Sequence, residues 1–269
     1  MRYLFPGLLA VVLVVSGPAH PQDADMVKLE TADDSRGWDA VGKLILGKRG
    51  FCTGALIGPQ LVLTAAHCLY DKTTGVQLRP EEIEFQAGFR NGRAVAYRRV
   101  SRAVAHPDYR FSAGDKLDRV TDDLALLELS QPIRLPSLAP FETGAAPVEG
   151  DPVGVVSYAQ YREEAPSIQE GCEVLAGERT ALILTCSVDF GSSGAPVFTI
   201  RDGVAKVVSV ISAKAEVDGR KVALAVPLAE PMAALRSALE DSKAGSFGGS
   251  KSVSVLSGGN GAGAKFVKP

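Results

Sequence analysis

The stretch CTGALIGPQLVLTAAHC, residues 52–68, decides how this chain is expected to fold. Two apolar runs lie on either side of a Gly-Pro dipeptide, so the stretch predicts a β-hairpin that ends at His67. Two further segments follow in order, DDLALLEL at 122–129 and GSSGAPVF at 191–198. A histidine, an aspartate and a serine therefore stand far apart in the chain, and only the fold can assemble them into one nucleophilic centre.

The composition around these segments is that of an ordinary globular protein. The chain has 269 residues, of which 46% are hydrophobic and 22% are charged. This is enough apolar material for one large core or two modest ones. The formal net charge of -2 offers no basic face, so nucleic acid is not an expected partner. The sequence does not indicate an oligomeric state.

The first residues have the pattern of a secretory signal. Arg2 precedes an apolar run from Leu8 to Val15, and small residues follow up to Ala19. The alternative is a membrane anchor, but a span needs about 20 apolar residues and this run is shorter. We therefore expect a signal peptide over 1–19, a secreted or periplasmic location, and no membrane span after signal cleavage.

Four cysteines remain after removal of the signal, and an even number in an exported chain predicts two disulfides. Cys52 and Cys68 flank one apolar hairpin, and Cys172 and Cys186 flank another, so we expect these two pairs. Each would close a short loop and contribute about 3 kcal/mol. Zinc is the competing interpretation, but no two cysteines have the spacing of a zinc site. No metal is expected.

Short apolar or alternating runs separated by turn residues predict two sets of about six strands. The first set is Val41–Leu46, Cys52–Ile57, Gln60–Thr64, Ile83–Gln86, Ala94–Val104 and Leu124–Leu129. The second set is Val153–Tyr158, Cys172–Leu175, Ala181–Cys186, Pro196–Ile200, Ala205–Ser212 and Val222–Val226. A connector with four prolines lies between the sets and is the expected boundary between two small barrels.

These patterns divide the chain into five parts. After the signal comes an N-terminal segment over 20–37, then a first barrel over 38–135. The second barrel over 136–242 ends in a helix from Pro231 to about Asp241, where apolar residues recur at spacings of three and four. The remainder, 243–269, is rich in glycine and serine and predicts a disordered tail.

His67 is the candidate general base. A serine hydroxyl is a weak nucleophile at neutral pH and needs a base within hydrogen-bonding reach, and imidazole suits this role. Of the three histidines, His20 lies at the expected cleavage site and His106 lies in AHPDY, which predicts a structural turn. The alternative for His67 is a packed histidine behind an apolar strand.

Ser193 is the candidate nucleophile, in the sequence Gly-Ser-Ser-Gly-Ala-Pro at 191–196. Small residues on both sides allow a tight turn that brings backbone amides toward a substrate carbonyl. The amides of Gly191 and Ser193 are the ones we assign to an oxyanion hole. Such turns also occur on ordinary surfaces, so the interpretation depends on the other two segments.

Asp123 is the candidate that orients the histidine. It directly precedes the apolar run LALLEL, so its carboxylate would be withdrawn from water and would need a donor. A histidine N–H would supply that donor and would fix the tautomer that accepts the serine proton. The neighbouring Asp122 is the rival, and could cap the turn before the strand instead.

These segments resemble those of the chymotrypsin-like (trypsin-like) serine peptidases over about residues 38–241. CTGALIGPQLVLTAAHC resembles the histidine strand with its disulfide, HPDY and DLALLEL resemble the aspartate region, and GSSGAPVF resembles the nucleophile turn. The resemblance implies an all-β fold of two antiparallel six-stranded β-barrels with the triad in the cleft between them. The mechanism expected here is taken from that family.

The chain departs from the animal digestive members of this family at two positions. Ser192 stands where those members have an aspartate before the nucleophile, which places the chain nearer to bacterial relatives such as the glutamyl-endopeptidase-like branch. The pocket-floor position is Ser187, which is uncharged, so a preference for Arg or Lys is not expected. By the same resemblance, Ser212 pairs with the substrate backbone, and Ala213 and Lys214 lie at the pocket edge, where Lys214 would favour an acidic side chain.

The expected function is therefore a secreted serine endopeptidase that acts on a protein or peptide substrate and uses no cofactor. Two alternatives are a catalytically silent binding module on the same fold and an esterase with the same triad. The esterase ranks below the peptidase because the chain lacks the strand-to-helix nucleophile elbow of the common esterase fold.

Overall fold

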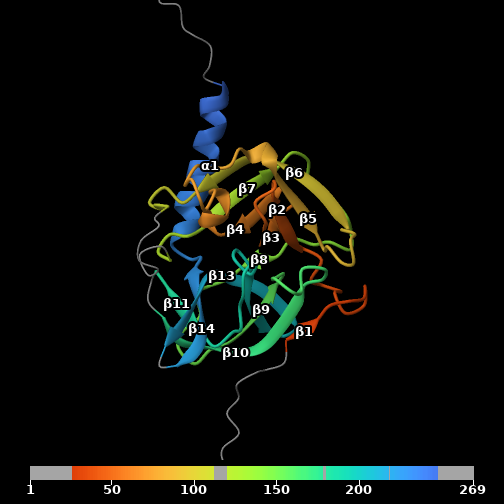
Figure 1. Cartoon of the computed structure of the whole chain (residues 1–269), viewed down its shortest axis with the longest axis vertical. Helices are drawn as coiled ribbons and strands as arrows, with labels where there is room; N and C mark the ends of the chain where they lie inside the picture. The colour runs from red at the N-terminus through yellow and green to blue at the C-terminus, as the bar shows by residue number, and fades with distance from the viewer. Residues whose placement is uncertain (1–25, 112–119, 178–179, 218, 248–269) are drawn as a thin grey trace, which may run out of the picture.

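Twelve strands form two closed antiparallel barrels in the computed structural model, which describes residues 26–111, 120–177, 180–217 and 219–247. Figure 1 shows the first barrel in orange and yellow above the second in green and blue. The expected all-β fold of two six-stranded barrels is confirmed. The expected signal over 1–19 lies outside the described residues.

The first barrel closes in the order β2-β3-β4-β7-β6-β5. Its strands are β2 (Val41–Leu46), β3 (Phe51–Gly58), β4 (Leu61–Thr64), β5 (Ile83–Ala87), β6 (Ala96–Ala105) and β7 (Ala125–Leu129). β5 alternates between buried and partly exposed residues, as expected for a strand with one face on the core, whereas β7 is buried almost throughout. This burial explains why the run after Asp123 is nearly continuous in apolar residues.

The second barrel closes because β9 pairs with both β10 and β12. Its strands are β9 (Pro152–Ser157), β10 (Ser167–Gly177), β11 (Leu182–Leu184), β12 (Pro196–Arg201), β13 (Val204–Val217) and β14 (Arg220–Pro227). β13 and β14 form its longest hairpin. All twelve strands match runs expected from the sequence. β10 begins at Ser167, earlier than the run that predicted it.

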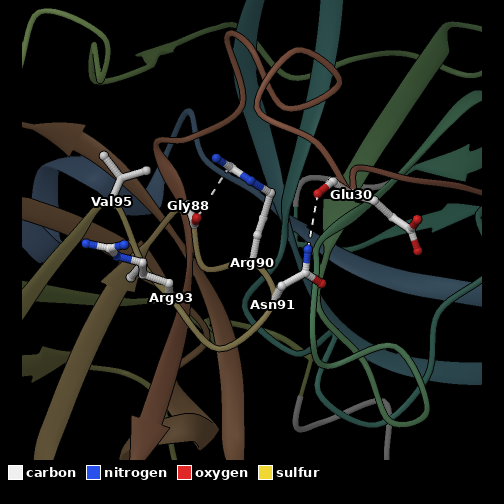
Figure 2. Close-up of a pocket in the computed structure, with 7 residues that line it drawn as sticks. Glu30, Gly88, Arg90, Asn91, Arg93 and Val95 are labelled. Atoms are coloured by element: carbon white, nitrogen blue, oxygen red, sulfur yellow. Dashed lines mark hydrogen bonds between the residues drawn. The ribbon is translucent and has the colours of Figure 1, made fainter.

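Two short strands were not predicted. β1 (Val27–Lys28) pairs with β10, and β8 (Glu142–Thr143), in the proline-bearing connector, pairs in parallel with β13. The segment after β1 also contacts the first barrel, because the side-chain amide of Asn91 donates to the carbonyl oxygen of Glu30 at 3.3 Å (Figure 2). The N-terminal segment therefore joins the two barrels.

Both expected disulfides, Cys52–Cys68 and Cys172–Cys186, are present. The first connects β3 to η1 (Ala66–Leu69), the short 3₁₀ helix that follows β4. The second closes the β10–β11 hairpin. Each therefore fixes a hairpin of a different barrel. A second 3₁₀ helix, η2 (Pro80–Glu82), precedes β5.

The helix α1 (Pro231–Phe247) follows the second barrel in sequence but packs against β6 and β7 of the first (Figure 1). Met232, Leu235 and Leu239 are buried on its inner face, and the Arg102 guanidinium donates to the carbonyl oxygen of Leu239 at 3.5 Å. The helix extends beyond Asp241 into the segment expected as a tail, and residues 248–269 lie outside the described part. Within that part, no helix has the length and apolar character that crossing a membrane requires.

Truncation of the helix anchor tests this packing. Leu235 is fully buried, so Leu235→Ala should lower the free energy of unfolding by about 2–5 kcal/mol, because it leaves a cavity between α1 and the first barrel. The exposed neighbour Arg236 provides the control, and Arg236→Ala should change stability by no more than about 0.5 kcal/mol. Urea unfolding measures both. Equal losses in the two variants would contradict the packing described.

Candidate active site

A cavity of about 440 Å³ lies between the two barrels. The first barrel and its loops contribute one side, and the loops around the nucleophile turn and β13 contribute the other. Six residues singled out from the sequence are among those lining it: His67, Asp123, Ser193, Ser212, Ala213 and Lys214. Ser187 does not line this cavity. It is exposed, and its backbone amide donates to the side-chain oxygen of Gln169 at 2.7 Å.

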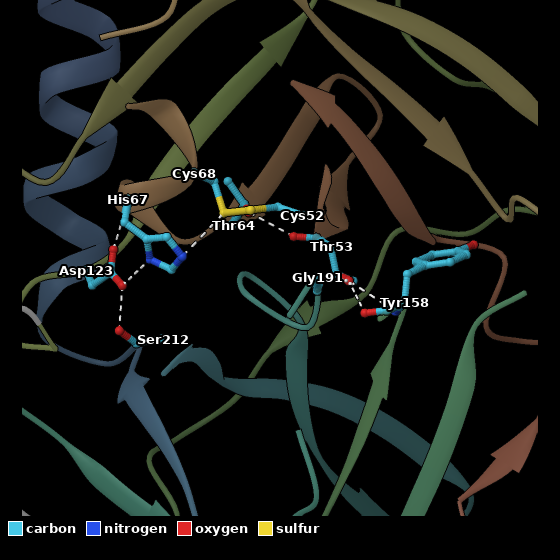
Figure 3. Close-up of a disulfide and its surroundings, with 9 residues drawn as sticks. All are labelled: Cys52, Thr53, Thr64, His67, Cys68, Asp123, Tyr158, Gly191 and Ser212. Carbon is cyan, nitrogen blue, oxygen red and sulfur yellow. Dashed lines mark hydrogen bonds and ion pairs between the residues drawn. A yellow bond between two sulfur atoms is a disulfide. The ribbon is translucent and has the colours of Figure 1, made fainter. Parts of the chain in front are cut away.

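His67 and Asp123 form a close pair (Figure 3). The imidazole Nδ1 lies 2.7 Å from Asp123 Oδ2, and the backbone amide of His67 donates to Asp123 Oδ1 at 2.8 Å. Because a carboxylate accepts hydrogen bonds, Nδ1 carries the proton, and the lone pair is on Nε2, which lies 3.9 Å from Cys68 Sγ. His67 belongs to η1, and the next residue in that 3₁₀ helix is Cys68, which forms the disulfide with Cys52. The imidazole is therefore held with Nε2 available as a base.

The Asp123 carboxylate is 1% exposed and has donors from both barrels. In addition to His67, the Ser212 hydroxyl of β13 donates to Asp123 Oδ2 at 2.5 Å. A buried carboxylate without donors would be costly, and these three hydrogen bonds offset its removal from water. The sequence did not indicate the contact of Ser212 with Asp123, because the two residues come from different barrels.

Asp122, the rival aspartate, faces another histidine. Its carboxylate lies 3.5 Å from Nδ1 of the buried His106. The Asp122 backbone has a φ of 62°, which turns the chain sharply just before β7. Adjacent aspartates thus point to different histidines, and Asp123 is the one that contacts His67.

Ser193 lines the same cavity from the side of the second barrel and is partly exposed. Its carbonyl oxygen accepts a hydrogen bond from the amide of Thr53 at 2.8 Å, which anchors it to the first barrel. Within the described residues no hydrogen bond joins the Ser193 hydroxyl to His67. The structure therefore contains a formed histidine–aspartate pair with the serine lining the same cavity.

Two glycines permit the turn that carries Ser193. Gly191 has a φ of 97° and Gly194 a φ of 79°, both in the region that side chains disfavour. A Cβ at Gly194 would lie 2.1 Å from the Thr64 hydroxyl, and one at Gly191 would lie 2.3 Å from the Phe51 ring. Both glycines therefore allow the turn to approach the first barrel closely.

Thr53 is the residue of the first barrel on which this turn rests, and no sequence pattern indicated its role. Its hydroxyl donates to the carbonyl oxygen of Gly191 at 2.9 Å and accepts from the amide of Tyr158 at 3.1 Å (Figure 3). Its carbonyl oxygen accepts from the Thr64 hydroxyl at 2.8 Å. Thr53 is fully buried, and a polar residue in an otherwise apolar strand is the only local signal that could have identified it.

The backbone amides of Gly191 and Ser193 donate no hydrogen bond to any group within the described residues. The neighbouring amides are all used, because those of Ser192, Gly194 and Ala195 donate to carbonyl oxygens at 2.8–2.9 Å. A bound oxyanion could therefore accept hydrogen bonds from the two unused donors.

Lys214, Asp189 and Phe190 form one wall of the cavity. Lys214 Nζ lies 2.8 Å from Asp189 Oδ1 and 4.1 Å from the centre of the Phe190 ring. The hydrogen bond from Lys214 lowers the pKa of the Asp189 carboxyl. The two side chains are about half exposed. Because they are paired, their opposite charges compensate each other at the mouth of the cavity.

The side chains of this site that could act as metal ligands do not suit a metal ion. Within the described residues, the one group of three candidate ligands is Cys52, His67 and Cys68. Both of its cysteine sulfurs are joined in the disulfide and cannot act as thiolates.

Comparison with known proteins agrees with this geometry. The family model described as a trypsin-like peptidase domain matches residues 52–208. The chain is 31% identical over 139 residues to human kallikrein-10, a match that covers 49% of this chain and 47% of that protein. It is 27% identical over 150 residues to a glutamyl endopeptidase of Bacillus licheniformis, covering 55% of this chain and 45% of that protein.

A shorter match shows 35% identity over 92 residues with the mouse complement C1r-B subcomponent, of which it covers 13%. The chain thus spans less than half the length of these curated relatives.

Removing the Thr53 hydroxyl tests how the nucleophile turn is held. Thr53→Val keeps the shape of the side chain but leaves the buried Tyr158 amide and the Gly191 carbonyl without this partner. We expect the free energy of unfolding to fall by about 1–3 kcal/mol. Thr199→Val, at a half-buried position of β12, is the matched control and should change little. Comparable stability of the two variants in urea unfolding would refute the role given to Thr53.

Proposed function

Because the chain belongs to the trypsin-like peptidase family, we propose that it is a serine endopeptidase that cleaves peptide bonds through Ser193, His67 and Asp123. The observation that carries the proposal is the pairing of His67 Nδ1 with the buried Asp123 at 2.7 Å, in a cavity that Ser193 also lines. The pairing leaves the Nε2 lone pair, which lies 3.9 Å from Cys68 Sγ, as the proton acceptor that the proposal requires.

In the first step, the Ser193 oxygen attacks the carbonyl carbon of the substrate as its proton moves to His67 Nε2. Asp123 stabilises the imidazolium that forms, and its bonds to the His67 backbone and to Ser212 keep the carboxylate in place. The imidazolium then protonates the leaving amine, which releases the first product and leaves an acyl group on Ser193. Water, deprotonated by His67, hydrolyses this ester.

The developing negative charge on the carbonyl oxygen needs donors that are already in position. The amides of Gly191 and Ser193 suit this role, because neither has another acceptor among the described residues. Loss of one such donor typically costs about 100-fold or more in rate. The chemistry is complete with these groups and calls for no metal or organic cofactor.

We also propose that the protein is exported. The apolar N-terminal run is typical of a secretory signal over 1–19, and the two disulfides suit an oxidising compartment. The proposed substrate is accordingly a protein or peptide outside the cytoplasm.

Two alternatives share the fold. A silent binding module would not need a buried aspartate that holds a histidine beside a serine, so the site geometry favours an enzyme. An esterase would use the same acyl transfer, and parallel assays on peptide and ester substrates distinguish it from a peptidase. The family match favours the peptidase.

Substitution of the triad tests the proposed activity. Ser193→Ala and His67→Ala should each reduce turnover at least about 1,000-fold, because the nucleophile and its base act as one unit. Thermal unfolding should show that both variants remain folded. A fluorophosphonate probe should label the unmodified protein at Ser193 and should fail to label Ser193→Ala. Hydrolysis that persists in Ser193→Ala would eliminate the proposed mechanism.

A second test addresses the side chain accepted next to the scissile bond. We propose that Lys214 attracts an acidic side chain, in line with the relative named glutamyl endopeptidase, but that Asp189 competes for the same ammonium group. Asp189→Asn should therefore raise the ratio of Glu to Leu cleavage by about 3- to 10-fold, which corresponds to ~1 kcal/mol of released attraction. Lys214→Met should lower this ratio below that of the unmodified protein.

Peptide-library profiling of the three proteins measures the ratio directly. A ratio that is the same in all three would show that Lys214 does not contact the substrate side chain.

A further inference from the structure

Ser192, the residue before the nucleophile, is fully buried behind the turn. Its hydroxyl lies 3.3 Å from the Ser157 hydroxyl and 3.5 Å from the carbonyl oxygen of Tyr158, and it accepts from the amide of Asp189 at 3.3 Å. Because the Ser192 hydroxyl contacts these three polar groups, it restricts the position of the nucleophile turn. The turn is thus held through Ser192 as well as through Thr53, and both hydroxyls lie near the carbonyl oxygen of Tyr158.

The group that organises these contacts is the guanidinium of Arg162. Its Nη1 donates to the carbonyl oxygen of Ser157 at 2.6 Å, and its Nη2 donates to the Ser157 hydroxyl at 2.9 Å and to the Ser192 hydroxyl at 3.2 Å. One planar group therefore connects the end of β9 to the residue next to the nucleophile. A guanidinium can do this because its donors are fixed in a rigid fork.

This charge is held in an unfavourable environment. Burial lowers the pKa of Arg162 to about 10, so the group is still protonated at neutral pH. The Asp189 carboxylate partly offsets this effect, although its direct ion pair is with Lys214. A partly buried cation whose hydrogen-bond acceptors are uncharged oxygens gains no direct ion pair from this placement, which points to a role in the site.

The loop that carries Arg162 is itself attached to the nucleophile turn. The amide of Gln160 donates to the carbonyl oxygen of Phe190 at 2.7 Å, and the amide of Arg162 closes a tight turn on the carbonyl oxygen of Ala159 at 3.0 Å. Tyr161 has a φ of 68° in this turn and is 90% exposed. The sharp backbone turn sends the Tyr161 ring outward and the Arg162 side chain inward.

We propose that Arg162 is a positioning residue that holds the nucleophile turn, through Ser192, in the conformation that presents the amides of Gly191 and Ser193 to the substrate. The proposal rests on the proposed peptidase function. Thr53 anchors the turn to the first barrel, and Arg162 anchors it to the second. Without Arg162 the Ser192 hydroxyl loses its charged donor, and the turn is free to rotate its amides away from the carbonyl oxygen.

If Arg162 has this role, its removal should weaken stabilisation of the transition state but not binding of the substrate. Arg162→Met should lower kcat about 10- to 100-fold with KM within about twofold of its original value, because Arg162 does not line the cavity in which the substrate would bind. Arg162→Lys keeps the charge without the fork and should recover part of the rate. Ser192→Ala removes the acceptor instead, and its effect should not add to that of Arg162→Met.

Inhibitor binding separates positioning from general damage. A peptide boronate, which forms a tetrahedral adduct at a serine, should bind Arg162→Met more weakly by the same factor as the fall in kcat. A product peptide of the same sequence should bind unchanged. Arg90→Met is the matched control, since Arg90 lines a different cavity (Figure 2), pairs with Asp39 at 2.6 Å and has no hydrogen bond to the nucleophile turn within the described residues. It should lower the melting temperature without changing kcat.

The outcomes are distinguishable. If the unmodified protein hydrolyses peptides but Arg162→Met retains its kcat, the positioning role is refuted while the peptidase function stands. Equal weakening of boronate and product peptide, or an equal loss of kcat in Arg90→Met, would also refute it. If the unmodified protein neither hydrolyses peptides nor reacts with a fluorophosphonate, the proposed function fails, and this inference fails with it.

Discussion

The buried carboxylate of Asp123 is the constraint on which the rest of the site depends. It is withdrawn from water at the start of β7, and it is satisfied only if both barrels are in place. His67 supplies two donors from the first barrel, and Ser212 supplies one from β13 of the second. Separation of the barrels would remove the Ser212 donor from this buried carboxylate, which is more costly than the loss of a surface contact. The interface between the barrels is therefore fixed at the point where the chemistry is proposed to occur.

The nucleophile turn depends on the same interface in a different way. Thr53 reaches it from β3 through its amide and its hydroxyl, and glycines at 191 and 194 let the turn approach closely enough to be reached. The helix α1 strengthens this arrangement, because it leaves the second barrel and packs on β6 and β7 of the first. Histidine and serine thus come from different barrels, but several contacts hold those barrels together.

Local patterns predicted the strands, the cysteine pairs and the three segments that meet at the cavity. Each of these features leaves a signal within about ten residues, such as the apolar run after Asp123 or the small residues around Ser193. The contacts of Thr53 with Gly191, and of Ser212 with Asp123, join residues 138 and 89 positions apart and leave no local signal. The short strands β1 and β8 were missed for the same reason, because two residues carry no periodicity.

The proposed specificity and the proposed positioning role meet at Asp189. Its carboxylate pairs with Lys214 at the wall of the cavity and also acts on the partly buried charge of Arg162 behind the turn. Its backbone carbonyl accepts from the amide of Ser192, and its amide donates to the Ser192 hydroxyl. A substrate carboxylate that drew Lys214 away would leave Asp189 to interact more strongly with Arg162, since the two opposite charges would then lack a competitor. In this arrangement, binding of an acidic side chain in the cavity would tighten the support of the turn that carries Ser193.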